Sequence, residues 1–219
     1  IQIQKKRKNF NEIYLYYLKK NPCIFDVGAN TGQSIERFKR IFSNCTIHSF
    51  EPHKECFDII KQKFNQNVVI NNFALGKDNQ NKDFNFNALT YTSSFLAINK
   101  KNKSSFLFKK KKKKKVKIVK LDYYVECYNI KNIDILKIDT QGYELNVLKG
   151  ATKTLKSKIV KFIEIEITLE NIYVGNPKFF EIDLIMNKNN FFIYRLGEFS
   201  YENQSDKLRS FDALYMKRG

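Results

Sequence analysis

The stretch Ile24-Phe25-Asp26-Val27-Gly28-Ala29-Asn30-Thr31-Gly32-Gln33-Ser34 decides the fold of this chain. A short apolar run ends at an acidic residue, passes two glycines and opens into a helical pattern, which predicts a strand, a tight loop and a helix N-terminus. Glycine lets the backbone of such a loop approach a ligand closely. The unpaired N–H groups at the start of the helix favour an anionic group. The stretch therefore predicts a nucleotide-type ligand at the end of the first strand.

Two kinds of nucleotide site use this geometry. A dinucleotide site would have the spacing G-x-G-x-x-G, but Asn30 occupies the second glycine position and Gln33 follows Gly32. The spacing D-x-G-x-N-x-G instead resembles motif I of the class I S-adenosylmethionine (SAM) methyltransferases.

Hydrophobic spacing predicts helices that alternate with strands along the chain. The helices are expected over 10–20, 33–42, 54–64 and 122–128, after Gly142 and from Phe179, and the strands over 23–27, 45–50, 68–70, 116–121, 133–139, 160–167, 191–194 and 213–216. Pro22 ends the N-terminal helical segment, residues 1–21. This alternation predicts an α/β fold with a doubly wound sheet, whose ligands bind at the carboxyl ends of the strands.

At 219 residues the chain is expected to form one domain, 1–219, with residues 78–115 as a β-hairpin-like excursion. It begins at Ile1 without Met, which suggests a piece of a longer protein or a trimmed chain. No apolar run is long enough to span a bilayer. The cysteines show no disulfide or metal-binding spacing, which favours free thiols in a reducing compartment, the cytoplasm.

Acidic residues lie at or near the expected strand ends: Asp26, Glu51, Asp139 and Glu166. Glu51, followed by Pro52, ends the second strand at the position where such βαβ units hold ribose hydroxyls. Asn72 and Phe73 follow the third strand, beside the place where adenine would lie. We expect Asn72 to hydrogen-bond the base edge and Phe73 to border its ring.

The net charge of +18 invites a nucleic-acid interpretation, but most of the lysines are spread over helix faces and loops. The exception is the run Lys109–Lys115. Seven adjacent lysines repel one another, so we expect a solvated hairpin tip or flexible loop. The alternative is a landing surface for an anionic acceptor, such as a nucleotide-sugar, a phosphorylated glycan or a membrane surface.

The chain as a whole resembles the FkbM-type methyltransferases from about Ile24 to Lys217. The motifs that carry the resemblance are Asp26–Gly32, Phe50-Glu51-Pro52, Asn72–Gly76, Leu136–Glu144 with Val147–Ala151, Glu166, Tyr173–Pro177 and Asp212-Ala213-Leu214. The lysine run and His53 depart from the family pattern.

The resemblance implies a Rossmann-like class I methyltransferase fold, with helices on both faces of a seven-stranded, mostly parallel sheet ordered 3-2-1-4-5-7-6. It also implies SAM-dependent O-methylation of hydroxyls, often on sugars of glycans, glycolipids or related metabolites. By position, the cofactor-binding residues would be Asp26, Gly28, Asn30, Thr31, Gly32, Glu51, Pro52, Asn72, Phe73 and Asp139.

A hydroxyl is a poor nucleophile while protonated, so a carboxylate should remove its proton. We expect Asp139 or Glu166 to be this base, with Glu144 as a third candidate that could instead brace the helix after Gly142. The carboxylates could also gather a divalent ion, although no metal site is predicted.

Two alternatives to a sugar O-methyltransferase remain. One is a nucleic-acid methyltransferase, which is disfavoured because Asp139-Thr140-Gln141-Gly142 lacks the Asn/Asp-Pro-Pro-aromatic block of enzymes that methylate exocyclic amines. The other is a SAM-binding module without catalysis. The sequence leaves the acceptor and the oligomeric state open.

Overall fold

The computed structural model describes residues 8–102, 110–202 and 205–219. The helices are α1 (Phe10–Tyr17), α2 (Gln33–Ile41), α3 (Lys54–Lys63), α4 (Leu121–Cys127), α5 (Glu144–Lys149), α6 (Thr152–Lys156) and α7 (Phe179–Lys188), with a short 3₁₀ helix η1 (Thr90–Thr92). The strands are β1 (Cys23–Val27), β2 (Thr46–Phe50), β3 (Val68–Asn71), β4 (Ala74–Leu75), β5 (Gln80–Asn87), β6 (Lys110–Val119), β7 (Ile133–Ile138), β8 (Val160–Thr168), β9 (Phe191–Tyr201) and β10 (Leu208–Lys217).

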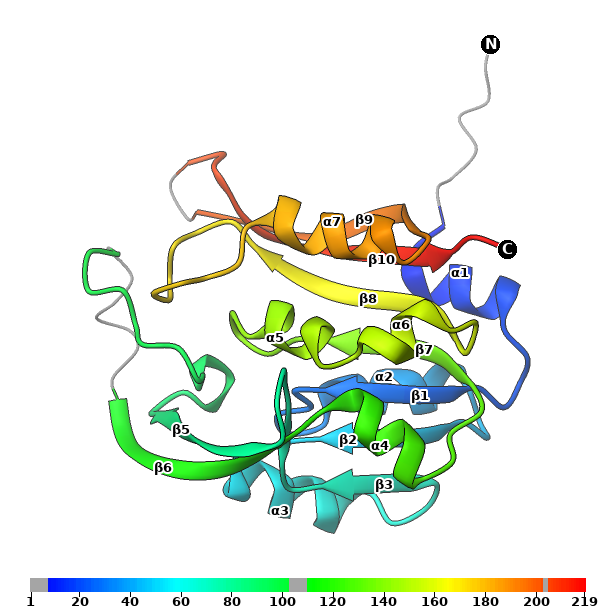
Figure 1. Ribbon diagram of the computed structural model, residues 1–219, viewed down its shortest axis with the longest axis horizontal. Coiled ribbons are helices and arrows are strands. Elements are labelled where there is room, and N and C mark those ends of the chain that lie inside the picture. Colours follow the sequence, from blue (N-terminus) through cyan, green and yellow to red (C-terminus); the bar gives the residue numbers. More distant parts are fainter. Residues whose placement is uncertain (1–7, 103–109, 203–204) are drawn as a thin grey trace.

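Seven strands form the central sheet in the order β3-β2-β1-β7-β8-β10-β9 (Figure 1). The pairs from β3 to β8 are parallel, and β10 lies antiparallel between β8 and β9. Counted within this sheet alone, the order is 3-2-1-4-5-7-6, as the resemblance implies. The five parallel strands are β3, β2, β1, β7 and β8. Because they run in one direction, their carboxyl ends meet at one edge of the sheet, which faces left in Figure 1.

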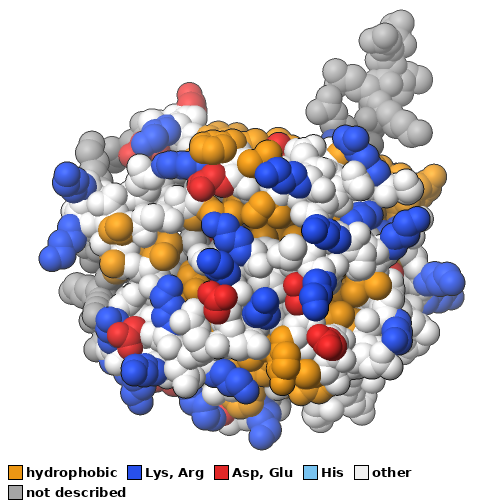
Figure 2. Space-filling model, viewed as in Figure 1, with side chains coloured by type: hydrophobic (Ala, Val, Ile, Leu, Met, Phe, Trp, Pro, Cys, Tyr) orange, Lys and Arg blue, Asp and Glu red, His pale blue; other side chains and the backbone are white. Residues whose placement is uncertain are grey.

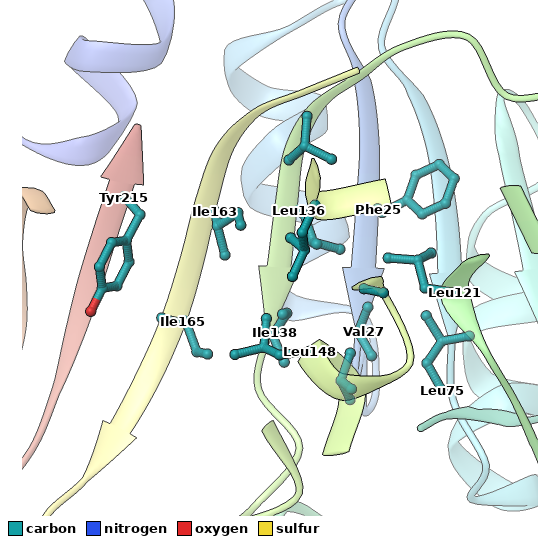
Figure 3. Close-up of a cluster of buried hydrophobic side chains, with 14 of the residues drawn as sticks. Phe25, Val27, Leu75, Leu121, Leu136, Ile138, Leu148, Ile163, Ile165 and Tyr215 are labelled. Carbon is teal, nitrogen blue, oxygen red and sulfur yellow. The ribbon is translucent and has the colours of Figure 1, made fainter. Parts of the chain in front are cut away.

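Helices cover both faces of this sheet, as expected. On the face turned toward the viewer in Figure 1, α4, α5 and α7 pack against the larger apolar cluster, part of which is drawn in Figure 3. There Leu136 and Ile138 of β7 lie between Val27 of β1 and Ile165 of β8. On the opposite face, α1 and α2 bury a second cluster around Phe38. The strands buried on both faces are nearly continuous apolar runs, as parallel sheets require.

A second, three-stranded sheet, β4-β6-β5, projects beside the carboxyl ends of the main strands. It corresponds to the predicted excursion, but the expectation for its lysines was wrong. Residues 110–115 are neither a hairpin tip nor a loop, because they form the first part of β6 and pair antiparallel with β5. The long ladder to β5 holds their backbone extended, and Lys113, Lys114 and Lys115 stay exposed in the strand. Lys109 lies outside the described residues.

Several boundaries also differ from the predictions. Helix α1 ends at Tyr17, because Leu18 is already extended. Strands β9 and β10 run beyond 191–194 and 213–216, because each supplies the other with hydrogen-bond partners where their side chains are polar. Helix α6 was missed, since five residues are too few to show a helical period.

Two further expectations concern the cysteines and the membrane. All four cysteines are free thiols. Within the described ranges, no helix is both long and apolar enough to cross a membrane.

Candidate functional site

A cavity of about 420 Å³ opens at the carboxyl ends of β1, β2 and β7. Its walls come from the glycine loop after β1, the end of β2, the turn after β7 and the small sheet beside them. Of the predicted site residues, Gly28, Asn30, Glu51, Pro52 and Asp139 line it. These residues are far apart in the sequence, and the parallel strands bring them together.

The glycine loop has the backbone geometry that its sequence predicts. Gly28 has φ +85°, and a Cβ there would lie 1.8 Å from the carbonyl oxygen of Asp139. The Gly28 N–H donates to the Phe50 carbonyl at 2.9 Å, and the Asp139 N–H donates to the Val27 carbonyl at 3.0 Å. The loop therefore ties the ends of β1, β2 and β7 together, and only a residue without a side chain fits at this position.

Glu51 is a buried carboxyl, with 5% of its surface exposed, at the mouth of this loop. Its Oε2 accepts from the Asn30 N–H at 2.7 Å and its Oε1 from the His53 N–H at 2.6 Å. Burial raises the pKa of Glu51 to about 8, although these two hydrogen bonds act to lower it. A ligand whose hydroxyls donate to this carboxyl would favour its ionised form.

Asp26 and its neighbours form a row of buried charges beneath the cavity. In the sheet register, Asp26 of β1 lies opposite Lys137 of β7, which lies opposite Glu164 of β8. Asp26 is fully buried, and the Ser34 hydroxyl donates to its Oδ2 at 2.5 Å. Its Oδ1 is buried without a hydrogen-bond partner among the described residues. Burial raises the pKa of Asp26, and the charge of Lys137 opposes this increase.

The turn after β7 presents a carboxylate to the cavity. Lys137 Nζ lies 3.2 Å from Asp139 Oδ2, and the side chain of Asp139 is 37% exposed. The Gln141 amide donates both to Asp139 Oδ1 at 3.0 Å and to Glu166 Oε2 at 3.1 Å. Asp139 and Glu166 thus form a linked carboxyl pair.

The two members of this pair differ in pKa. Burial acts to raise the pKa of Asp139, but the charge of Lys137 and hydrogen bonds from Gln141 and Glu166 hold it below its ordinary value. Burial and the charge of Asp139 raise the pKa of Glu166 well above its ordinary value. At neutral pH Asp139 is therefore ionised, and Glu166 holds a proton more readily than Asp139 does.

Glu144, the third predicted base, has a different set of contacts. It is buried, and its Oε1 accepts from the Thr140 N–H, the Thr140 hydroxyl and the Gly142 N–H at 2.8 to 3.1 Å. These bonds hold the turn that carries Asp139. They favour the bracing role over the catalytic one.

Other predicted residues support the cavity without lining it. The Asn72 amide donates to the Glu51 carbonyl at 2.9 Å, and the Phe73 ring packs on Phe50 and Tyr124. Five more predicted site residues do not line this cavity, as the described residues form it. They are Asp26, Thr31, Gly32, Glu144 and Glu166.

Four charged residues that line this site were not predicted from the sequence. Arg37 donates to both oxygens of Glu164 at 2.7 and 2.8 Å, and both residues line the cavity with Lys137 and Asp212. Burial and the charge of Glu164 raise the pKa of Asp212 to about 7. The sequence does contain a pattern that points to two of them. Lys137 and Glu164 interrupt apolar strands, and a charge buried in such a strand must be paired.

Aromatic side chains form a further part of the cavity wall. Phe84 comes from β5, Tyr91 from η1, Phe95 from the segment after it and Tyr143 from the turn before α5. The Phe95 and Tyr143 rings lie 4.5 Å apart between centroids. In the described part of the chain, no group of three or more His, Cys, Asp or Glu residues is placed to hold a metal ion.

Comparison with known proteins identifies the family. The model of the methyltransferase FkbM domain matches residues 26–193, from the acid of the glycine loop into β9. The chain belongs to the FkbM methyltransferase family.

Curated relatives of this FkbM domain are distant. Methyltransferase sdnD of Sordaria araneosa is 28% identical over an alignment of 159 positions that covers 61% of this chain and 61% of that protein. The hexuronic acid methyltransferase AglP of Haloferax volcanii is 25% identical over 152 residues, which are 68% of this chain and 57% of that protein. The match therefore spans about three fifths of the length of each relative.

Solved structures confirm the fold. The methyltransferase FkbM of Methylobacillus flagellatus KT matches 92% of this chain and 45% of its own with a TM-score of 0.57 and 12% identity. TrmK of M. capricolum, solved with S-adenosyl-homocysteine, matches 96% of this chain and 69% of its own with a TM-score of 0.50 and 12% identity. At such low identity these likenesses establish the methyltransferase fold alone.

Proposed function

We propose that this FkbM domain transfers a methyl group from SAM to a hydroxyl of a sugar. The observation that carries the proposal is Asp139, an ionised carboxylate exposed to the cavity between a nucleotide-type loop and an aromatic wall. That residues 1–219 act as one catalytic domain stays a prediction.

The residues of the loop side fit SAM. The buried Glu51 carboxyl is placed for the ribose hydroxyls, and Phe50, Pro52, Ala74 and Leu75 supply apolar walls for a base. Helix α2 begins at Gln33 after the N-cap Gly32, which provides no side-chain cap, so the first N–H groups of the helix remain available beside the cavity. The buried, unpartnered Asp26 Oδ1 lies beneath the same loop and suits an ammonium group.

SAM, when bound, supplies a methyl group on a positively charged sulfur. The chain must hold the acceptor oxygen in line with that methyl group and take its proton. Asp139 is ionised and can accept the proton, while the Gln141 amide, which also donates to Glu166, fixes the orientation of its carboxylate. Lys137 keeps Asp139 ionised before the acceptor arrives. Its charge also compensates for the negative charge of Asp26 below.

The acceptor side suits a sugar. Asp139, Asp212 and Gln141 offer planar hydrogen-bonding groups to hydroxyls, and the rings of Phe84 and Tyr91 offer faces for the C–H side of a pyranose. The name of the Haloferax volcanii relative, a hexuronic acid methyltransferase, supports the same class of acceptor.

The cofactor is tested by calorimetric titration with SAM, S-adenosyl-homocysteine, NAD and ATP. We expect selective binding of the two SAM-type ligands and weaker binding in Glu51→Ala. Binding of NAD or ATP instead, or of none of the four, would refute the assignment of the loop.

Catalysis is tested with Asp139→Asn and a panel of sugars, by release of S-adenosyl-homocysteine. Loss of a positioned base lowers kcat by about 10²–10⁴-fold, whereas SAM affinity should change little. Asp58→Asn, on the exposed face of α3, is the matched control and should keep the wild-type rate. Wild-type turnover in Asp139→Asn would remove this residue from the mechanism.

A further inference from the structure

A second, more open cavity of about 460 Å³ lies on the β5–β6 ribbon. Three lysines line it, Lys82 from β5 and Lys113 and Lys115 from β6, together with Phe95. We call this cavity the lysine groove. It contains Lys113 and Lys115 of the lysine run, and the proposed methyl transfer assigns no role to these residues.

Strand register explains why Lys113 and Lys115 gather on one face of the ribbon, whereas Lys82, which lies opposite Val116, alternates to the other face and reaches the cavity wall beside Phe95. Lys113 lies opposite Asn85 and Lys115 lies opposite Asp83, and residues two apart on a strand project from the same face. Lys113 Nζ lies 2.8 Å from Asp83 Oδ2. Within the described part of the chain, Lys82 and Lys115 belong to no ion pair. Three lysines against one aspartate leave about two positive charges in the groove.

One aromatic wall separates the lysine groove from the candidate active site. Phe95 lines both cavities, and Tyr143 lines the active-site cavity. Lys82 Nζ lies 5.9 Å from the Phe95 ring centroid and 5.0 Å from the Tyr143 ring centroid. A molecule with its hydroxyl at Asp139 needs to pass only the edge of this wall to reach the lysines.

We propose that the lysine groove binds a phosphate or pyrophosphate group of the acceptor, which is therefore a phosphorylated sugar. The proposal rests on the proposed function, because the sugar must occupy the cavity beside Asp139. A phosphoryl group carries up to two negative charges, which matches the groove better than a single carboxylate does. Lysine binds phosphate as a point charge without a fixed geometry. Cations that would repel one another across the ribbon are stabilised when such a group lies between them.

On the face of the molecule drawn in Figure 2, the positive charges are dispersed. Figure 2 shows Lys and Arg side chains spread over the viewed face with Asp and Glu among them. The lysine groove differs because its lysines line a hollow that shares a wall with the candidate active site. A diffuse positive surface would attract any polyanion, whereas this geometry selects an anion attached to a sugar.

The test compares the double variant Lys82→Gln/Lys115→Glu with Lys114→Glu. Lys114 is the control, because it is exposed on the same strand, next to Lys115, projects from the face opposite to Lys113 and Lys115, and does not line the lysine groove formed by the described residues. Binding of inorganic pyrophosphate is measured by calorimetry. Methyl transfer is measured with pairs of sugars that differ only in a phosphate group.

We expect the double variant to weaken pyrophosphate binding and to raise KM for the phosphorylated sugar by about tenfold or more, which is the loss of one charge-assisted contact. Its kcat, its SAM affinity and its KM for the unphosphorylated sugar should stay within about twofold of wild type. Lys114→Glu should leave all of these values near wild type.

Two sources of the phosphate are distinguished by separate assays. Saturable transfer to a soluble sugar phosphate supports a free acceptor, whereas Lys115-dependent binding to phosphatidylcholine vesicles only when they contain phosphatidate supports a lipid headgroup. Equal losses in the double variant and in Lys114→Glu, or tighter binding of a single-stranded oligonucleotide than of pyrophosphate, would overturn the phosphate subsite.

Failure of the subsite is distinct from failure of the proposed function. If unphosphorylated and phosphorylated sugars are methylated with the same KM, the subsite is wrong and the sugar methyltransferase stands. If pyrophosphate binds with the expected variant pattern but no sugar is methylated, the anion site stands and the sugar methyltransferase is wrong.

Discussion

Replacement of Gly28 by alanine should open the junction on which the cofactor loop depends. Two effects act at this position. The left-handed φ of +85° costs a residue with a Cβ about 1–2 kcal/mol. The Cβ would also lie 1.8 Å from the Asp139 carbonyl oxygen, a backbone atom that cannot rotate away. Overpacking of this kind typically costs a further 1–3 kcal/mol. We therefore expect Gly28→Ala to lower the free energy of unfolding by about 2–5 kcal/mol.

Gly175→Ala separates these two effects. Gly175 also has a left-handed φ, +78°, but a Cβ there would have no heavy atom within 4 Å. It should cost only the backbone strain, about 1–2 kcal/mol. Alanine also lowers the conformational entropy of the unfolded chain relative to glycine. This effect changes the free energy of unfolding of both variants by the same amount, so it does not alter the difference between them.

The assay is urea denaturation of both variants, together with SAM titration. Gly28→Ala should lose more stability than Gly175→Ala and should also lose SAM affinity, because Asp139 must move away from Gly28. Equal stability of the two variants would refute the close approach of β1 and β7 at this point.

Two further predictions concern buried polar groups. The pKa of Glu51 is about 8 in the native state and about 4.5 in the unfolded state. Between these pH values the native state binds the proton and the unfolded state does not. The contribution of Glu51 to the free energy of unfolding should therefore fall by about 1.4 kcal/mol per pH unit as the pH rises. Glu51→Gln should abolish this slope and cost about 1–3 kcal/mol, because an amide nitrogen would face a backbone N–H group. Tyr14→Phe should cost about 1.5–3 kcal/mol, because the Tyr14 hydroxyl donates to the buried Glu164 carboxylate at 2.6 Å.

Both predictions are checked by urea denaturation. For Glu51 the series runs from about pH 5 to about pH 8, and parallel curves for wild type and Glu51→Gln would contradict the raised pKa. For Tyr14 the control is Tyr16→Phe, whose ring is 68% exposed. Similar losses in the two tyrosine variants would show that the hydrogen bond to Glu164 contributes little.

Much of the fold could be predicted from local sequence patterns. The stretch from Ile24 to Ser34 indicates a strand, a loop and a helix, and the structure has β1, the glycine loop and α2 at these positions. The apolar run around Leu136 likewise predicts a strand buried on both faces, which is β7. These predictions succeeded because the period of apolar residues reports directly which faces are buried.

The lysine run shows where local patterns fail. A run of like charges indicates solvent exposure but contains no information about its pairing partner. Residues 110–115 are a strand because β5, more than twenty residues earlier, supplies the ladder. Helix propensity and charge repulsion are local, whereas strand pairing is a long-range property.

At the candidate site, the sequence by itself determined the glycine loop, the acids at the strand ends and the turn that holds Asp139. Only the tertiary structure decided how those acids differ. Lys137 holds the pKa of Asp139 below its ordinary value, burial and the charge of Asp139 raise the pKa of Glu166, and Glu144 accepts hydrogen bonds from the turn. The physical reason is that a carboxyl group's pKa depends on its burial and on the charges within a few ångströms. Those neighbours come from other strands of the sheet, so the order of residues along the chain does not contain them in readable form.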